Sequence, residues 1–437
     1  MRMTRMPASL LSRTLGWWRL TFDDPRRAVF FFAPLLGFLP LTAGSFATGW
    51  YFLGVVYVGL IWLTGRVGWV WPESTAFACL VALGYFASTL ISAVFFEDRL
   101  AGLMDAGTNL QFLFLVPLVG AVIQARMVDV WSLFLNGLRA GIIVAALIAA
   151  CQVFIWRLPR ATAGMVNAIL AGDIAILAAA LSLVGFSRLG AGMKAFALVA
   201  SGAGIATSLL TQTRGALLAL PLFLIVSAYN LWPYVRRRPG LSAGVGLGFI
   251  LSIGALAALI KIPERVDQFL VSVETREAAL TRDASTAHRI ILWTYGLDAF
   301  ADRPALGYGQ QHTVAEVRRR AREARMPVPL HTHLHNEFVN TAVARGLVGL
   351  AALILLLAAP VITAIQSSRD DRYGERVAFA VLLSGGYATF GLTNLIFGHD
   401  QMATFFASCY LVLVAAAYQA AVMETDFATP DVRRPFG

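Results

Sequence analysis

Histidines gather in one stretch of this sequence, which ends at the start of a long apolar run. Five of the six histidines lie between residues 262 and 336. Three of them, His331, His333 and His335, alternate just before Asn336 and the apolar run that follows. Histidine is the side chain best able to exchange a proton near neutral pH. This stretch is therefore the first candidate for a general base.

Arginines stand at the ends of other apolar runs, together with amide, aromatic and glycine residues. The positions are Arg160 with Asn167, Arg214 with Gly215, Arg289 with Trp293, Arg303 to Gly309 with Tyr308, and Arg345 with Gly346. A guanidinium group is planar and permanently charged, and it matches phosphate oxygens with two parallel hydrogen bonds. A single arginine at a helix end often only reaches for the membrane interface. Several on one side of a membrane indicate an anionic, lipid-linked ligand such as a pyrophosphate.

Other kinds of site find little support in the sequence. It has no Walker-type phosphate loop and no dinucleotide-binding glycine fingerprint. Glu97-Asp98 is the one acidic pair expected in a short outward loop, and His331, His333 and His335 could ligate zinc if that stretch were extended. No matching fourth ligand is evident, so we predict neither a metal nor another cofactor.

The elements that position these residues must lie in a membrane. Apolar residues make up 58% of the chain and charged residues 14%, whereas a soluble domain carries roughly 25% charged residues. Lipid offers the backbone no hydrogen bonds, and apolar runs of about 17–25 residues predict spanning helices, not barrel strands. The net charge of +10 does not indicate nucleic acid, because the arginines cluster between the apolar runs. The cysteines fall inside these runs and are expected to be small buried hydrophobes: Cys79, Cys151 and Cys409.

Twelve apolar segments predict an all-α polytopic protein with about twelve transmembrane helices. They lie near 28–46, 49–65, 74–96, 107–125, 130–156, 164–186, 192–210, 214–230, 241–261, 337–366, 377–397 and 402–423. The chain then divides into an N-terminal segment, nine helices, a large loop, three helices and a tail: 1–27, 28–261, 262–336, 337–423 and 424–437.

The placement of basic residues predicts the orientation. With a cytoplasmic N-terminus, the cytoplasmic segments hold eighteen Arg and Lys residues and the short loops opposite hold four. Basic residues favour the cytoplasmic side, so both termini are expected there and residues 262–336 are expected in the periplasm. That loop should contain one helix over 287–300, packed on the membrane domain. A second, over 313–325, has an apolar stripe and an arginine-rich face, which either lies on anionic headgroups or is simply solvated.

These motifs resemble the O-antigen ligase family. The resemblance rests on the twelve segments, the loop between segments nine and ten, and the order of the short motifs. Those motifs are Arg214-Gly215, Arg289 with Trp293, Pro304 with Gly307-Tyr308-Gly309, and His335-Asn336 with Gly346 and Gly349. The same signature is shared by O-antigen polymerases and protein O-oligosaccharyltransferases.

The resemblance implies a GT-C-like helical glycosyltransferase of the bacterial inner membrane, acting at the periplasmic face without a metal and with inversion. Its donor would be O-antigen linked to undecaprenyl pyrophosphate, its acceptor lipid A–core, and membrane lipids would surround it. Arg214 and Arg289 would hold the pyrophosphate and His335 would be the general base. Substrate contacts are expected from the following residues: Arg160, Asn167, Asn336, Trp293 and Tyr308. No oligomeric state follows.

Two alternatives remain open. The shared motifs do not indicate which acceptor the enzyme uses, so a polymerase or a protein O-oligosaccharyltransferase fits them too. The ligase is preferred because the chain is short and adds no C-terminal domain. A transporter of polyisoprenoid lipids or solutes belongs to a different class. It is disfavoured because the sequence shows no internal repeat and its long loop follows segment nine on the outer side.

Overall fold

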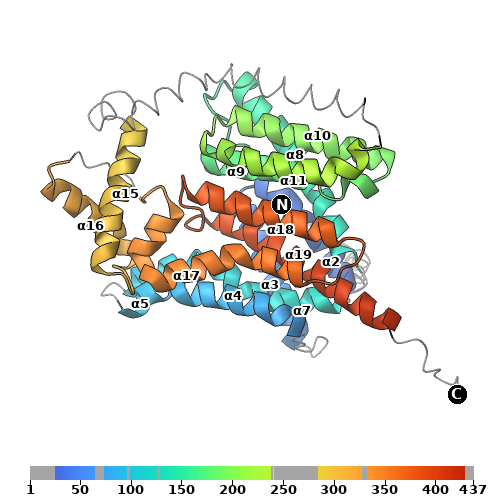
Figure 1. Ribbon diagram of the computed structural model, residues 1–437, viewed down its shortest axis with the longest axis horizontal. Helices are drawn as coiled ribbons and strands as arrows, with labels where there is room; N and C mark the ends of the chain where they lie inside the picture. The colour runs from blue at the N-terminus through green and yellow to red at the C-terminus, as the bar shows by residue number, and fades with distance from the viewer. Residues whose placement is uncertain are drawn as a thin grey trace, which may run out of the picture.

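The computed structural model describes residues 25–63, 73–95, 99–125, 128–237, 240, 284–326 and 332–428. Within these ranges every regular element is a helix (Figure 1). The first half contains α2 (Pro25–Thr42), α3 (Phe46–Leu63), α4 (Glu73–Thr89), α5 (Ile91–Phe95), α6 (Arg99–Gly107), α7 (Leu110–Gln124), α8 (Val130–Ala150), α9 (Ala168–Leu181), α10 (Ala191–Leu210), the 3-10 turn η3 (Gly215–Ala219) and α11 (Leu220–Val235). The second half contains α15 (Ala284–Asp302), α16 (Gln310–Glu323), α17 (Glu337–Gln366), α18 (Tyr373–Gly391) and α19 (Asp400–Ala428).

The chain is a polytopic membrane protein. Its described residues form seven helices long and apolar enough to cross a membrane, or eight if the bent pair α6 and α7 is one span. Eleven of the twelve predicted segments coincide with helices. The remaining segment, 241–261, lies outside the described residues. The all-helical fold class is thus confirmed, while the number twelve stays a prediction.

Three segments differ from the prediction in their bounds. A separate helix, α6, stands where a short outward loop was expected, and it meets α7 at a bend of 45°. α9 covers only 14 residues because Asn167 caps its start and Gly185, with φ of 73°, ends the turn that follows it. α18 stops at Gly391, six residues before the predicted end of its segment.

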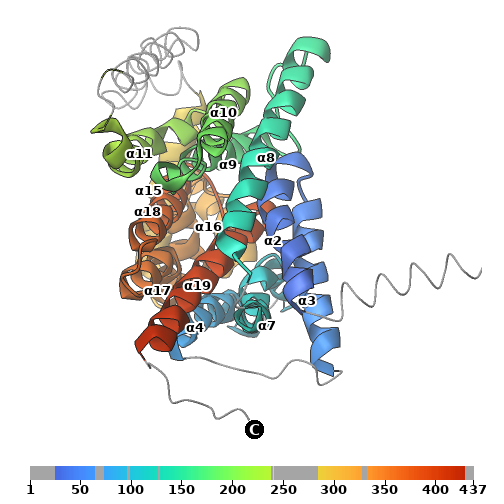
Figure 2. The ribbon, with the colours of Figure 1, turned by 90° about the vertical axis from the view of Figure 1, so that its right-hand side faces the viewer.

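The helices α2 and α8 lie side by side along one edge of the bundle (Figure 2). Their backbones approach closely because glycines face the contact. A side chain at Gly137 of α8 would collide with the carbonyl of Pro34, and one at Gly141 would collide with the backbone of Phe38. Small residues of this kind are how helices pack in a membrane, where lipid offers no hydrophobic drive for association.

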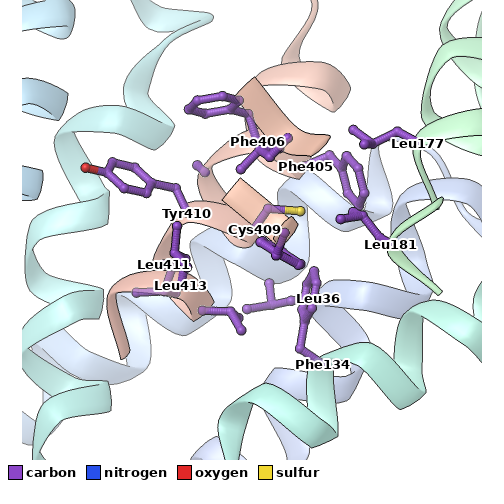
Figure 3. Close-up of a cluster of buried hydrophobic side chains, with 14 of the residues drawn as sticks. Leu36, Phe134, Leu177, Leu181, Phe405, Phe406, Cys409, Tyr410, Leu411 and Leu413 are labelled. Carbon is purple, nitrogen blue, oxygen red and sulfur yellow. The ribbon is translucent and has the colours of Figure 1, made fainter. Parts of the chain in front are cut away.

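The centre of the molecule is an apolar core around α19. Almost three quarters of its spanning window, 72%, is buried inside the protein. Figure 3 shows Phe405 and Cys409 of α19 packed toward Leu177 and Leu181 of α9. Thirteen of the fourteen residues of α9 are buried, and all of the thirteen except Asp173 are apolar, as expected of a helix that protein encloses. The three cysteines are free, as expected, and two of them are buried: Cys79 and Cys409.

The loops sort into two sets at opposite ends of the bundle. At one end Arg372 pairs with Asp129, and Arg188 pairs with Glu375. At the other end the amide of Gly164 donates to the carbonyl of Leu41, and Thr48 donates to Asp400. These sets are the loops that the charge count assigns to the cytoplasmic and periplasmic sides, respectively.

A small helical layer covers the second end, at the left of Figure 1. This layer, called the cap below, consists of α15, α16 and residues 332–346. Val317 and Ala321 on one face of α16 are buried, and Val317 shares an apolar cluster with Leu292 of α15 and Val343 of α17. The two predicted loop helices are therefore present. The stripe of α16 faces protein, so its apolar side does not insert into lipid.

Candidate functional site

His335 is held between two anchored neighbours. Leu334 before it is fully buried in the cap. Asn336 after it caps α17: its side-chain oxygen accepts hydrogen bonds from the amides of Phe338 and Val339, at 3.0 and 3.1 Å. The His335 backbone is left-handed, with φ of 51°. Its ring is half-buried and lies 4.2 Å from the ring of His333, centroid to centroid. His331 lies outside the described residues.

α15 brings its own polar residues toward this segment. The indole nitrogen of Trp293 donates a hydrogen bond to the carbonyl of Leu334, at 2.9 Å. Arg289 stands four residues before Trp293, so both side chains lie on one face of the helix. The side chain of Arg289 is half-buried. The structure thus brings Trp293 into contact with the His335 segment and sets Arg289 one helical turn away.

Arg214 and Arg160 lie on two loops that are joined by hydrogen bonds. The Arg160 side chain donates to the carbonyl of Thr211 at 2.8 Å, and Gln212 donates to the carbonyl of Pro159 at 3.0 Å. Arg214 precedes η3 and is exposed, whereas Arg160 is half-buried. Two predicted phosphate ligands therefore sit on neighbouring backbone.

Asn167 and Tyr308 have structural partners. Asn167 caps α9 by accepting from the amide of Ile169 at 2.8 Å. The Tyr308 ring lies 4.7 Å from the guanidinium of Arg303, and its hydroxyl accepts from Arg320 at 3.1 Å. Both residues therefore stabilise local structure. Their contact with a substrate remains a prediction.

The glycines of the motifs lock the cap to α17. Gly346 kinks α17 with φ of 62°, where a side chain would collide with the backbone of Ala305. Gly307, with φ of 70°, lies against the backbone at Val343. Only glycine adopts these conformations at such close approach without strain. These residues therefore hold the cap in place and are not positioned as ligands.

A segment that the sequence did not single out connects the two halves of the site. Residues 392–399, hereafter the bridging segment, form a loop between α18 and α19, although 392–397 were predicted to continue a helix. The bridging segment begins next to Asn336, which donates to the carbonyl of Leu392 at 3.3 Å. Thr393 lies against Gly215, because a methyl group added to that glycine would lie 2.5 Å from the Thr393 hydroxyl.

The bridging segment also carries the sixth histidine. The His399 ring lies 6.2 Å from that of His333. Burial lowers the pKa of His399, and the neighbouring Asp400 partly opposes this shift. His399 is therefore held neutral near pH 7. No local signal pointed to it, because it lies far along the chain from the other histidines.

A ladder of buried polar side chains runs along one face of α17. The Glu337 carboxylate is 1% exposed and accepts hydrogen bonds from the amides of Ile396 and Phe397, at 2.7 and 3.1 Å. Its other oxygen accepts from Thr341, which accepts in turn from Arg345. Arg345 also donates to Ser88 of α4, at 3.3 Å. The sequence shows that Glu337, Thr341 and Arg345 are spaced four residues apart. It does not show their hydrogen-bond partners in other elements.

No cluster of three or more His, Cys, Asp or Glu residues suited to a metal occurs within the described part of the chain. Glu97 and Asp98 lie outside that part. What the site does offer is two groups of arginines and a row of imidazoles at one end of a membrane protein. Such an arrangement can bind a phosphate-bearing lipid and accept a proton beside it.

A family model described as O-antigen ligase matches residues 196–354. This part of the chain is therefore similar to the O-antigen ligase family. The match contains Arg214, Arg289 and His335, so the resemblance seen in the motifs is confirmed. Arg160 and the bridging segment lie outside it.

One similar curated protein, from Haemophilus influenzae, is named as uncharacterized. It is 26% identical over 179 residues, which are 39% of this chain and 44% of that protein. The chain therefore spans less than half the length of this relative. The similarity of residues 196–354 to the O-antigen ligase family supports a glycosyltransferase of the ligase and polymerase type.

Proposed function

We propose that this protein is an O-antigen ligase. It transfers O-antigen polysaccharide from undecaprenyl pyrophosphate to lipid A–core in lipopolysaccharide biosynthesis. The observation that carries the proposal is how the structure connects three residues of the matched range, His335, Arg289 and Arg214. His335 and Arg289 belong to one hydrogen-bonded cap, and the bridging segment links Asn336, beside His335, to Gly215, beside Arg214.

The reaction follows from the chemistry of these groups. His335 takes the proton of the acceptor hydroxyl as that oxygen attacks the anomeric carbon of the donor. The bond from this carbon to the pyrophosphate oxygen breaks on the opposite face, so the configuration inverts. Undecaprenyl pyrophosphate leaves with the bonding electrons. Arg214 and Arg289 stabilise the charge that develops on it, with Arg160 as a third cation.

The lipid substrates fit the placement of the site at one end of the bundle. The pyrophosphate of the donor lies at the headgroup level of the bilayer, where exposed arginines reach it. We propose that this end faces the periplasm and that the protein resides in the bacterial inner membrane. No nucleotide is needed there, because the donor arrives already activated. Asn336, Trp293, Tyr308 and Asn167 complete the substrate surface in this proposal, which involves no metal.

Reconstitution with defined substrates tests the proposal. The purified protein is placed in liposomes with lipid-linked O-antigen and rough lipopolysaccharide, and products are separated on a gel. A ladder of O-antigen on lipid A–core is expected, and it should persist in EDTA. A longer lipid-linked glycan would assign a polymerase, and glycosylation of an added pilin-type protein would assign an oligosaccharyltransferase. Movement of the donor across the bilayer without transfer would assign a transporter.

A further inference from the structure

The bridging segment, residues 392–399, lies between the two groups of proposed catalytic residues and is tied to both. We propose that it sets their separation, with Glu337 and Thr393 as positioning residues. This inference rests on the proposed function, because it assigns a role in the same reaction. Neither residue is proposed to touch the reacting atoms.

Glu337 fixes the bridging segment from the cap side. The carboxylate is buried and accepts two consecutive amides of that segment, those of Ile396 and Phe397. These two hydrogen bonds hold the bridging segment against the start of α17. Glu337 is also only two residues from His335. A shift of the bridging segment is therefore transmitted directly to the start of α17, which carries the proposed base.

Thr393 fixes the segment from the side of Arg214. Gly215 leaves just enough room for the Thr393 hydroxyl, which donates to the carbonyl of Phe390 at 3.3 Å. A residue with a side chain at position 215 would push the bridging segment away. The glycine at position 215, next to Arg214, is therefore explained by its contact with Thr393. Neither turn formation nor helix packing accounts for it.

The buried ladder makes the Glu337 contact rigid. Thr341 and Arg345 extend it along α17 to Ser88 of α4. A catalytic base must keep its distance from the leaving-group ligands, because a misplacement of about 1 Å can cost roughly 100-fold in rate. Hydrogen bonds between rigid helices, such as those of the ladder, keep the distance between His335 and the arginines constant.

The first experiment compares Glu337→Gln with Asp370→Asn in the full-length reconstituted protein. Gln keeps the length of the side chain but replaces one of the two accepting oxygens with an NH2 group, which cannot accept a hydrogen bond. Asp370 pairs with the buried Arg376 at the opposite end and serves as the matched control. For E337Q we expect kcat for transfer to fall ~10- to 100-fold while KM for the lipid-linked donor changes little. For D370N we expect a lower melting temperature and an unchanged kcat.

A second experiment uses rescue. Gly215→Ala should lower kcat because its methyl group meets the Thr393 hydroxyl. Thr393→Ala removes that hydroxyl and leaves space that the methyl group at position 215 fills. The contact between the two positions is then restored, so the double variant should recover most of the lost rate. A merely structural effect of the added methyl group on η3 would not be reversed by a change in another loop.

The outcomes separate the two proposals. If wild-type protein shows no transfer, the proposed function fails. If wild type is active and E337Q keeps its kcat, or if Thr393→Ala does not rescue Gly215→Ala, the role of the bridging segment is wrong and the ligase assignment stands. Equal losses of kcat in E337Q and D370N would also overturn the positioning role, since they would reflect stability alone.

Discussion

The backbone at His335 is left-handed, and this decides which substitution tests its role. Asparagine tolerates φ of 51° far better than most residues. His335→Asn therefore keeps the local conformation while removing the titratable ring. We expect transfer to fall ~10²–10⁴-fold, the usual contribution of a general base, with little change in melting temperature. Gel-based transfer rates and thermal unfolding measure the two effects.

The neighbouring histidine provides the control for this variant. His333→Asn should cost much less activity, because its ring lies beside that of His335 and not at the start of α17. Similar mild losses of transfer rate in variants of His331, His333 and His335 would contradict the proposal that His335 alone is the general base.

The arginines are best tested by keeping their charge. Arg214→Lys and Arg289→Lys retain a cation but lose the planar fork that binds two phosphate oxygens. We expect each to reduce transfer by about tenfold or more, an interaction energy of roughly 1.4 kcal/mol. Arg372→Lys is the control, because Arg372 makes a two-pronged contact with Asp129 at the far end. Near-normal transfer by both Arg214→Lys and Arg289→Lys would contradict the proposal that these arginines bind the pyrophosphate.

At the scale of single elements, the kink of α17 holds the cap. Gly346→Ala would place a methyl group against the backbone of Ala305 at a φ that L side chains rarely adopt. We expect a loss of at least ~2 kcal/mol in unfolding free energy and release of residues 303–309 from α17. Thermal unfolding and limited proteolysis of the cap measure this. Gly120→Ala is the control, because no atom lies within 4 Å of the added methyl group, and it should be neutral or stabilising. If Gly120→Ala destabilises the protein as much as Gly346→Ala, the role of Gly346 in holding the cap is wrong.

The elements themselves were predictable to the extent that their causes are local. The apolar run of α17 begins after His335-Asn336, and the cap residue Asn336 marks its start within the sequence. α18 was predicted too long because four of the six residues from Leu392 to Phe397 are apolar, as at a helix end. It is a loop because Glu337, 59 residues away from Ile396, binds its amides. No window of sequence contains that contact.

The same distinction applies to the site. Arg214, Arg289 and His335 could be named from residue type, because arginine and histidine are unusual beside apolar runs. Glu337 and Arg345 were visible, but their burial in one ladder depends on the packing of α17 against α4. His399 was passed over because its neighbours in space are distant in sequence.

For the whole molecule, the orientation in the membrane is testable with single cysteines. Glu323 of the cap and Asp371 at the opposite end are exposed, at 61% and 95% of their side chains. In a variant without the native cysteines, Glu323→Cys should react with an impermeant maleimide when only the outer membrane is opened. Asp371→Cys should react only after the inner membrane is opened. The reverse pattern would invert the proposed topology.

The pairing of Asp129 with Arg372 makes the stability of the end opposite the cap depend on pH. Partial burial tends to raise the pKa of Asp129, but hydrogen bonds from Arg372 and Ser132 outweigh it and hold that pKa below its usual value. A lowered carboxyl pKa stabilises the folded state above the unfolded pKa, near 3.9, and this stabilisation is lost as the pH falls through the folded pKa. Asp129→Asn should therefore lower the melting temperature at pH 7 and flatten its decline below about pH 4. An identical pH profile in the variant would contradict this.

The position of the cap within the chain has a consequence for biosynthesis. α15 and α16 leave the ribosome before residues 334–347, yet their apolar faces are completed by Leu334 and Val343 and closed by the kink at Gly346. Until α17 has been made, the apolar cluster that Val317 shares with Leu292 of α15 therefore lacks Leu334 and Val343. The cap is assembled last, around a helix that is already entering the bilayer, so any delay in the insertion of α17 prolongs the exposure of an unfinished apolar surface.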